Sequence, residues 1–145
     1  MRVAVIHGPN LNLLGSRELS VYGDLTLEAV NVQIRSASED LGIQVEITQT
    51  AREGEIIELL HAGIDSVDGA LLNPGAYAHT SRAIADAVTA VDYPVVEVHL
   101  SNIHAREPWR RRSVTAEAAY GMVTGFGAMS YVAGLHVLKG LGAQR

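Results

Sequence analysis

The sequence predicts an α/β protein built on a parallel β-sheet. Short runs rich in β-branched residues alternate along the chain with longer stretches in which apolar residues recur every three or four positions. This alternation is typical of strands joined by crossover helices. The length of 145 residues and the hydrophobic content of 48% fit one domain with one filled core.

The elements can be placed in order along the chain. The first strand is predicted at 2–6, where valine and isoleucine dominate. An amphipathic helix follows, opened by Thr26 as its N-cap and ended by Gly42. The same patterns predict further strands at 45–47, 69–72, 95–98 and 122–124, and further helices at 53–62, 80–91 and 128–141. Gly134 and Gly140 lower the intrinsic helix propensity of the last helix.

Five strands with intervening helices favour a flavodoxin-like, doubly wound parallel sheet with helices on both faces. Such sheets bind ligands beyond the carboxyl ends of their strands. Long polar segments follow three of the predicted strands, at 7–22, 73–79 and 99–112. We therefore expect a functional site where these three segments meet.

Composition excludes several classes of function. The net charge of −5 argues against nucleic-acid or membrane partners, which require a clustered positive surface. No apolar run approaches the roughly 20 residues that span a bilayer, and the N-terminus lacks a basic segment followed by an apolar one, so we expect a cytoplasmic protein. Cysteine is absent, which removes disulfides and thiolate nucleophiles. The sole lysine, Lys139, lies far from the polar segments, so an imine with a ketone is not expected.

Nucleotide and metal binding also fit the sequence poorly. The segment after the first strand reads HGPNLNLLGSRELSVYG, which is long, contains Pro9 and lacks the GxGxxG pattern. His7 stands where a response regulator needs acidic residues to hold a divalent cation. The spacing of His99 and His104 matches no common set of metal ligands. We therefore expect no cofactor and no metal.

The sequence resembles the type II 3-dehydroquinate dehydratases of the shikimate pathway in three segments, IHGPNLNLLGSRELSVYG, LLNPGAYAHTS and VEVHLSNIHAREPWRR. The resemblance implies one flavodoxin-like catalytic domain over 1–145 and a dodecamer built as four trimers. It also implies a hydro-lyase that converts 3-dehydroquinate to 3-dehydroshikimate by anti elimination of water through an enolate. That reaction belongs to chorismate and aromatic amino acid biosynthesis.

Catalytic roles follow from the resemblance. Tyr22 would take a proton from C2 of the substrate, and Arg17 beside it would favour its ionised form. His99 would protonate the departing C1 hydroxyl, and Asn10 would help to hold a water that stabilises the enolate.

Elementary chemistry supports the pairing of Tyr22 with Arg17, because a tyrosine with an ordinary pKa is ionised in about one molecule in a thousand at neutral pH. A guanidinium roughly 4 Å away offsets this deficit by an amount on the order of 4 kcal/mol.

The resemblance further implies substrate-binding residues. The substrate carboxylate would be received by Asn73 and by the backbone at Leu100 and Ser101. Ring hydroxyls would be bound by His79, Arg110 and Asp86, with Asp86 supplied by an adjoining subunit of the trimer. In the run 110–112, at most one or two of the three arginines can face one ligand, because adjacent side chains point in different directions.

Strand geometry adds Glu97 to the site. Glu97 precedes His99 by two residues, so on a strand both side chains point to the same side and Glu97 could orient the imidazole. Ala78 and Val114 depart from the usual family residues, threonine and tyrosine, and these departures concern the ring-hydroxyl pocket and the subunit contacts rather than a catalytic position. The long segment between Asn10 and Tyr22 is expected to act as a lid.

Two alternatives remain open from the sequence. One is a lyase or isomerase that acts on a different cyclic hydroxy acid. The other is a carboxylate-binding module that has lost catalysis. A base and an acid matched within one site favour an enzyme, because a module that only binds needs neither.

Overall fold

The computed structural model describes residues 1–16 and 18–142. In this part of the chain, five strands form one parallel sheet in the order β2-β1-β3-β4-β5. The strands are β1 (Arg2–His7), β2 (Gln44–Gln49), β3 (Gly69–Asn73), β4 (Val95–His99) and β5 (Gly121–Thr124). The predicted flavodoxin-like sheet is confirmed. Four strands extend past their predicted ends, and three of them, β1, β3 and β4, have His7, Asn73 and His99 as their last residues.

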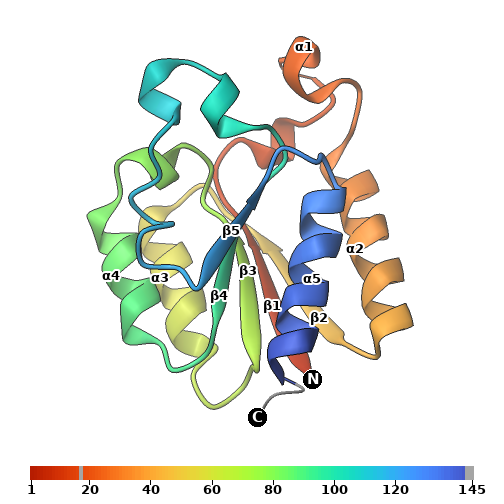
Figure 1. Ribbon diagram of the computed structural model, residues 1–145, viewed down its shortest axis with the longest axis vertical. Helices are drawn as coiled ribbons and strands as arrows, with labels where there is room; N and C mark the ends of the chain where they lie inside the picture. The colour runs from red at the N-terminus through yellow and green to blue at the C-terminus, as the bar shows by residue number, and fades with distance from the viewer. Residues whose placement is uncertain (17, 143–145) are drawn as a thin grey trace.

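Pairs of helices cover the two faces of the sheet (Figure 1). On one face α2 (Leu27–Leu41) packs beside α5 (Met129–Gly142), and on the other α3 (Glu53–Ala62) packs beside α4 (Arg82–Ala90). Among residues 1–16 and 18–142, no helix has both the length and the apolar character needed to cross a membrane.

Capping residues set the helix boundaries. The Thr26 hydroxyl accepts a hydrogen bond from the Ala29 N–H, and Gly42 ends α2 in the left-handed conformation, as predicted. The predicted start of the third helix at 80 was wrong. Helix α4 begins two residues later because the Ser81 hydroxyl caps it by accepting from the Ile84 N–H.

The core has two parts because successive side chains of a strand point to opposite faces. Val5 and Leu71 pack beneath α2 and α5, whereas Ile6 and Leu72 pack beneath α3 and α4. Gly134 lets α5 approach the sheet closely, since a Cβ at this position would lie 2.8 Å from Cδ2 of Leu71. The loss of helix propensity at this glycine is therefore accompanied by closer packing.

Short helices occur in the connections that the sequence analysis treated as polar segments. They gather at the carboxyl end of the sheet (Figure 1). They comprise α1 (Leu19–Tyr22) and the 3₁₀ helices Leu11–Leu13, Gly75–His79, Ile103–Ala105 and Pro108–Arg110. Most of the predicted site residues lie at this end of the molecule.

Gly8 allows the segments after β1 and β3 to touch. Its N–H donates to the Asn73 carbonyl oxygen at 2.7 Å. A Cβ at Gly8 would come within 2.6 Å of the Pro74 carbonyl carbon. The contact is with backbone, which cannot move aside as a flexible side chain can.

Gly8→Ala is expected to lower the free energy of unfolding by roughly 1–3 kcal/mol, the usual cost of forcing extra volume into packed structure. Gly54→Ala is the control, because a Cβ there meets nothing within 4 Å in α3, and it should stabilise by roughly 0.5 kcal/mol. Urea unfolding of both variants measures the difference. Equal stability of the two variants would contradict the close approach.

Candidate active site

One cavity lies at the carboxyl ends of β1, β3 and β4, lined by residues from all three following connections. Eight predicted site residues line it: Asn10, Tyr22, Asn73, His79, His99, Leu100, Ser101 and Arg110. Two others do not, since Glu97 is buried behind His99 and Asp86 is exposed on α4. Arg17 lies outside the described residues.

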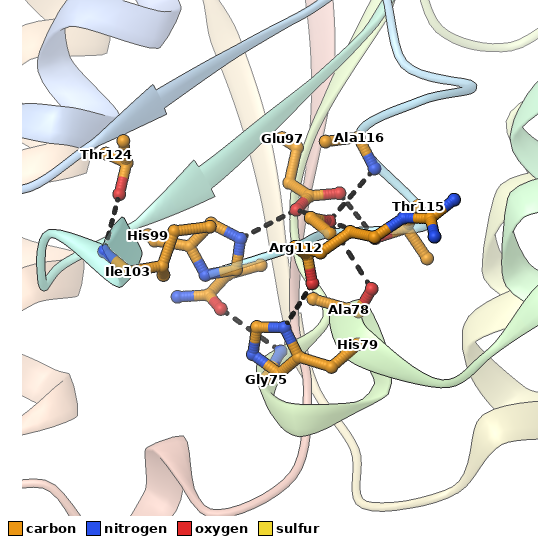
Figure 2. A network of polar contacts seen from close by, with 12 residues as sticks. Gly75, Ala78, His79, Glu97, His99, Ile103, Arg112, Thr115, Ala116 and Thr124 are labelled. Carbon is orange, nitrogen blue, oxygen red and sulfur yellow. Dashed lines mark hydrogen bonds and ion pairs between the residues drawn. The ribbon is translucent and has the colours of Figure 1, made fainter. Parts of the chain in front are cut away.

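Glu97 holds the imidazole of His99. Nε2 of His99 lies 2.7 Å from Oε1 of Glu97, whose side chain has no solvent exposure. Figure 2 shows the ring turned toward this carboxylate, which lies two residues earlier on β4. The hydroxyls of Ser113 and Thr115 donate to the two oxygens of the same carboxylate. The carboxylate is thus surrounded by donors, as a buried charge requires.

This arrangement decides which nitrogen of His99 can serve a ligand. A carboxylate oxygen that already receives a hydroxyl hydrogen acts as an acceptor, so Nε2 of His99 carries the hydrogen between them. Nδ1 is then the nitrogen that can exchange a proton in the cavity. The predicted orientation of His99 by Glu97 agrees with this geometry, whereas Ser113 and Thr115 were not predicted.

His79 is oriented by a backbone carbonyl. Nδ1 of His79 donates to the Arg112 carbonyl oxygen at 2.8 Å (Figure 2). Burial lowers the pKa of His79, against the opposing effect of this hydrogen bond. The ring is therefore neutral at pH 7, and Nε2 can accept a hydrogen bond from a hydroxyl group.

Arg110 is held from two sides. Its Nε donates to Oε2 of Glu107 at 2.6 Å, and its guanidinium carbon lies 4.0 Å from the centre of the Trp109 ring. Arg111 and Arg112 are exposed. Of the three adjacent arginines, therefore, only Arg110 lines the cavity, in line with the expectation that one or two could do so.

Tyr22 contacts a cation, Arg106, that the sequence pattern did not single out. Nη1 of Arg106 donates to the Tyr22 hydroxyl oxygen at 2.9 Å, and Nη2 donates to Oε1 of Glu18 at 2.9 Å. Only 9% of the Arg106 side chain is exposed. The sequence shows only that Arg106 lies in the connection after β4, which contains four arginines. No pattern separates Arg106 from the others until the connection is folded.

Backbone geometry fixes the remaining cavity walls. Asn10 adopts a left-handed conformation with φ of 69° and accepts from the Leu13 N–H through its carbonyl. The Thr124 hydroxyl donates to the Ser101 carbonyl at 2.8 Å, and the Gly127 N–H donates to the Leu100 carbonyl at 2.9 Å. The chain at 100–101 is thereby tied to the end of β5.

The two departures from the family pattern lie together. The Val114 N–H donates to the Ala78 carbonyl oxygen at 2.7 Å, and both residues are buried. Neither lines the cavity. Their effect on the site is therefore indirect, through the segments that carry His79 and Ser113.

The single lysine of the sequence lies away from the cavity. Lys139 is exposed on α5, and its neighbour Leu138 packs against Gly69 at the start of β3, so this lysine lies at the opposite end of the sheet from the cavity. In residues 1–16 and 18–142, no group of three or more histidine, aspartate or glutamate side chains is placed to hold a metal ion.

Comparison with known proteins gives one family. The family model described as dehydroquinase class II matches residues 1–139. The 3-dehydroquinate dehydratase of Clostridium acetobutylicum is 49% identical over 141 residues, which cover 97% of this chain and 98% of that protein. The 3-dehydroquinate dehydratase of Thermoanaerobacter pseudethanolicus is 50% identical over 138 residues, covering 95% of this chain and 93% of the relative.

Solved structures agree with the sequence comparison. The type II dehydroquinase of Butyrivibrio crossotus superposes with a TM-score of 0.93 at 38% identity, covering 95% of this chain and 97% of that one. The type II dehydroquinase of Propionibacterium acnes gives 0.91 at 35% identity, with 96% of each chain covered. The resemblance found in the three sequence segments is thus confirmed, and this chain belongs to the class II dehydroquinase family.

Proposed function

We propose that this chain is a type II 3-dehydroquinate dehydratase, a hydro-lyase that converts 3-dehydroquinate to 3-dehydroshikimate in the shikimate pathway. One observation carries the proposal beyond family membership. A phenol that receives a guanidinium hydrogen bond and an imidazole held by a buried carboxylate line the same cavity. A β-elimination next to a ketone needs such a base and such an acid.

In the proposed reaction, the phenolate of Tyr22 removes a proton from C2, and the electron pair moves to the neighbouring ketone oxygen to form an enolate. The enolate then re-forms the ketone as the C1–C2 double bond forms and the C1–O bond breaks. His99 gives a proton to the departing hydroxyl, which leaves as water. Asn10, which lines the cavity, is assigned to hold the water that stabilises the enolate oxygen.

The anti stereochemistry requires the base and the acid to reach opposite faces of the substrate ring. Tyr22 belongs to α1 in the connection after β1, whereas His99 ends β4. Two separate segments therefore deliver the two groups to the cavity. Asn73 with the backbone at 100–101 would bind the carboxylate, and His79 with Arg110 would bind ring hydroxyls.

Assembly and location are further parts of the proposal. A single catalytic domain over 1–145, working as a dodecamer of four trimers, follows from the family resemblance. The cytoplasmic location is proposed from the sequence pattern. Asp86 is exposed on α4 and does not line the cavity of its own chain. Its assigned contact with a ring hydroxyl therefore needs a neighbouring subunit, which the trimer would supply.

The activity is measured by adding the purified protein to 3-dehydroquinate and following the ultraviolet absorbance of the conjugated enone product. The wild type should turn over, and Tyr22→Phe, which keeps the ring but removes the base, should lose roughly 10²- to 10⁴-fold in kcat. A folded wild type that gives no absorbance rise would overturn the assignment and favour either a different cyclic hydroxy acid or a binding module.

Arg17 and Arg106 can be separated by substitution. A nearby opposite charge favours an ionised group by roughly 10- to 1000-fold, so Arg17→Ala and Arg106→Ala should each lower kcat at least about tenfold, with a smaller change in KM. Arg35→Ala is the control, because this arginine is half-exposed on α2 and pairs with Glu28. An arginine whose loss leaves kcat unchanged has no part in activating Tyr22.

Glu97→Gln tests the orientation of His99. The variant keeps the size of the side chain but removes the charge that supports the imidazolium form, so kcat should fall by roughly tenfold or more. KM should change little, because Glu97 is buried behind His99 and does not line the cavity. Glu117→Gln, on an exposed glutamate of the connection after β4, is the control. Intact turnover in Glu97→Gln would refute the role.

A further inference from the structure

A second buried polar network lies on the other face of the sheet, outside the proposed catalytic steps. The register of β1 and β3 places His7 next to Asn73. Both side chains contact the hydroxyl of Tyr131 on α5: Nδ1 of His7 at 2.9 Å and Nδ2 of Asn73 at 3.0 Å. Nε2 of His7 lies 2.9 Å from Oδ1 of Asn31 on α2. Tyr131 and His7 have no solvent exposure.

The direction of every hydrogen bond in this network follows from one backbone donor. The Gly75 N–H points at Oδ1 of Asn73 at 3.2 Å, so the amide oxygen must face Gly75 and the amide nitrogen must face Tyr131. Tyr131 then accepts from Asn73 and donates its own hydrogen to Nδ1 of His7. Nε2 of His7 carries the ring hydrogen and donates it to Asn31.

The protonation states fit this direction. Burial lowers the pKa of His7 to about 4, so the ring is neutral and has one accepting nitrogen at pH 7. Burial also raises the pKa of Tyr131 well above its usual range, so its hydroxyl keeps the hydrogen that it donates. In the reverse direction, Tyr131 would accept from both neighbours and its own hydrogen would need a third partner.

We propose that Tyr131, backed by His7 and Asn31, is a positioning residue that acts together with the Gly75 N–H to hold the Asn73 amide as a hydrogen-bond donor toward the carboxylate of the substrate. An amide nitrogen has two hydrogens. Tyr131 takes one, which leaves the second for the cavity that Asn73 lines. A flipped amide would instead turn its oxygen toward the anion. The inference rests on the proposed function, in which Asn73 receives the carboxylate.

Tyr131→Phe removes the acceptor for Asn73 while keeping the ring that fills the core. KM for 3-dehydroquinate should rise about tenfold, the effect of losing one well-aligned hydrogen bond to a charged group, while kcat stays within about threefold.

Tyr93→Phe is the matched control. Tyr93 is also buried, and its hydroxyl donates to the Leu60 carbonyl at 2.5 Å, but it precedes β4 at the other end of the sheet from the cavity. It should lose stability without a change in KM.

A double-mutant cycle shows whether Tyr131 acts through Asn73. In the background of Asn73→Ala, Tyr131→Phe should add no further increase in KM, because the group that it positions is gone. Additive effects of the two substitutions, or an equal KM in Tyr131→Phe and Tyr93→Phe, would overturn the inference while the dehydratase assignment stood.

The network also has a readout that does not depend on turnover. Nitrogen-15 NMR of the wild type should show His7 as the neutral tautomer with its hydrogen on Nε2. A hydrogen on Nδ1 would reverse the direction of the network and overturn the inference. If the wild type failed to dehydrate 3-dehydroquinate, the proposed function would fall, and with it the carboxylate as the group that Asn73 meets.

Discussion

The site depends on the pairing of polar side chains that are buried where three adjacent strands end. His7, Asn73 and Glu97 are almost wholly buried, and a buried polar group left without a partner costs roughly 1–3 kcal/mol. In the described ranges 1–16 and 18–142, no buried side-chain nitrogen or oxygen lacks a hydrogen-bond partner. The orientation of these groups is therefore determined by the protein interior before any ligand arrives.

Strand alternation separates this pairing into two independent networks. His7 and Asn73 are satisfied by α5 and α2 on one face of the sheet, and Glu97 is satisfied by the segment 113–115 that follows β4. The proposed acid and the proposed carboxylate-binding amide thus rest on rigid elements. Tyr22, by contrast, lies on a four-residue helix within a long connection and contacts Arg106 from another connection. The proposed base is thus carried by a connection, whereas the proposed acid and the proposed carboxylate-binding amide are carried by strands.

The sequence predicted those elements in which apolar residues recur at a regular spacing. Strand and helix positions followed from alternation and helical spacing, and the shared direction of Glu97 and His99 followed from the two-residue repeat of a strand. The short helices of the connections have too few residues to show a period. Arg106 was missed for a different reason, because only the folded connection distinguishes it from its three neighbouring arginines. Tyr131 was missed because its contact with Asn73 arises from the packing of α5 against β3. The role given to Arg17 came from the family resemblance and lies outside the described residues.

The position of the only lysine limits the chemistry that is available in the cavity. Lys139 lies at the end of the sheet opposite to the cavity, so a reaction in this cavity has no lysine with which to form an imine as an electron sink. The negative charge that develops on the ketone oxygen of the proposed substrate must then be met by hydrogen-bond donors. Donors stabilise a developing charge most effectively when they do not have to reorient during the reaction. Asn10, the residue assigned to that oxygen, belongs to neither buried network. The networks instead fix the direction of two other proposed groups, the Asn73 amide that would meet the carboxylate and the His99 imidazole that would protonate the departing hydroxyl. The packed interior around β1, β3 and β4 therefore also determines which hydrogen-bond donors and acceptors face the cavity.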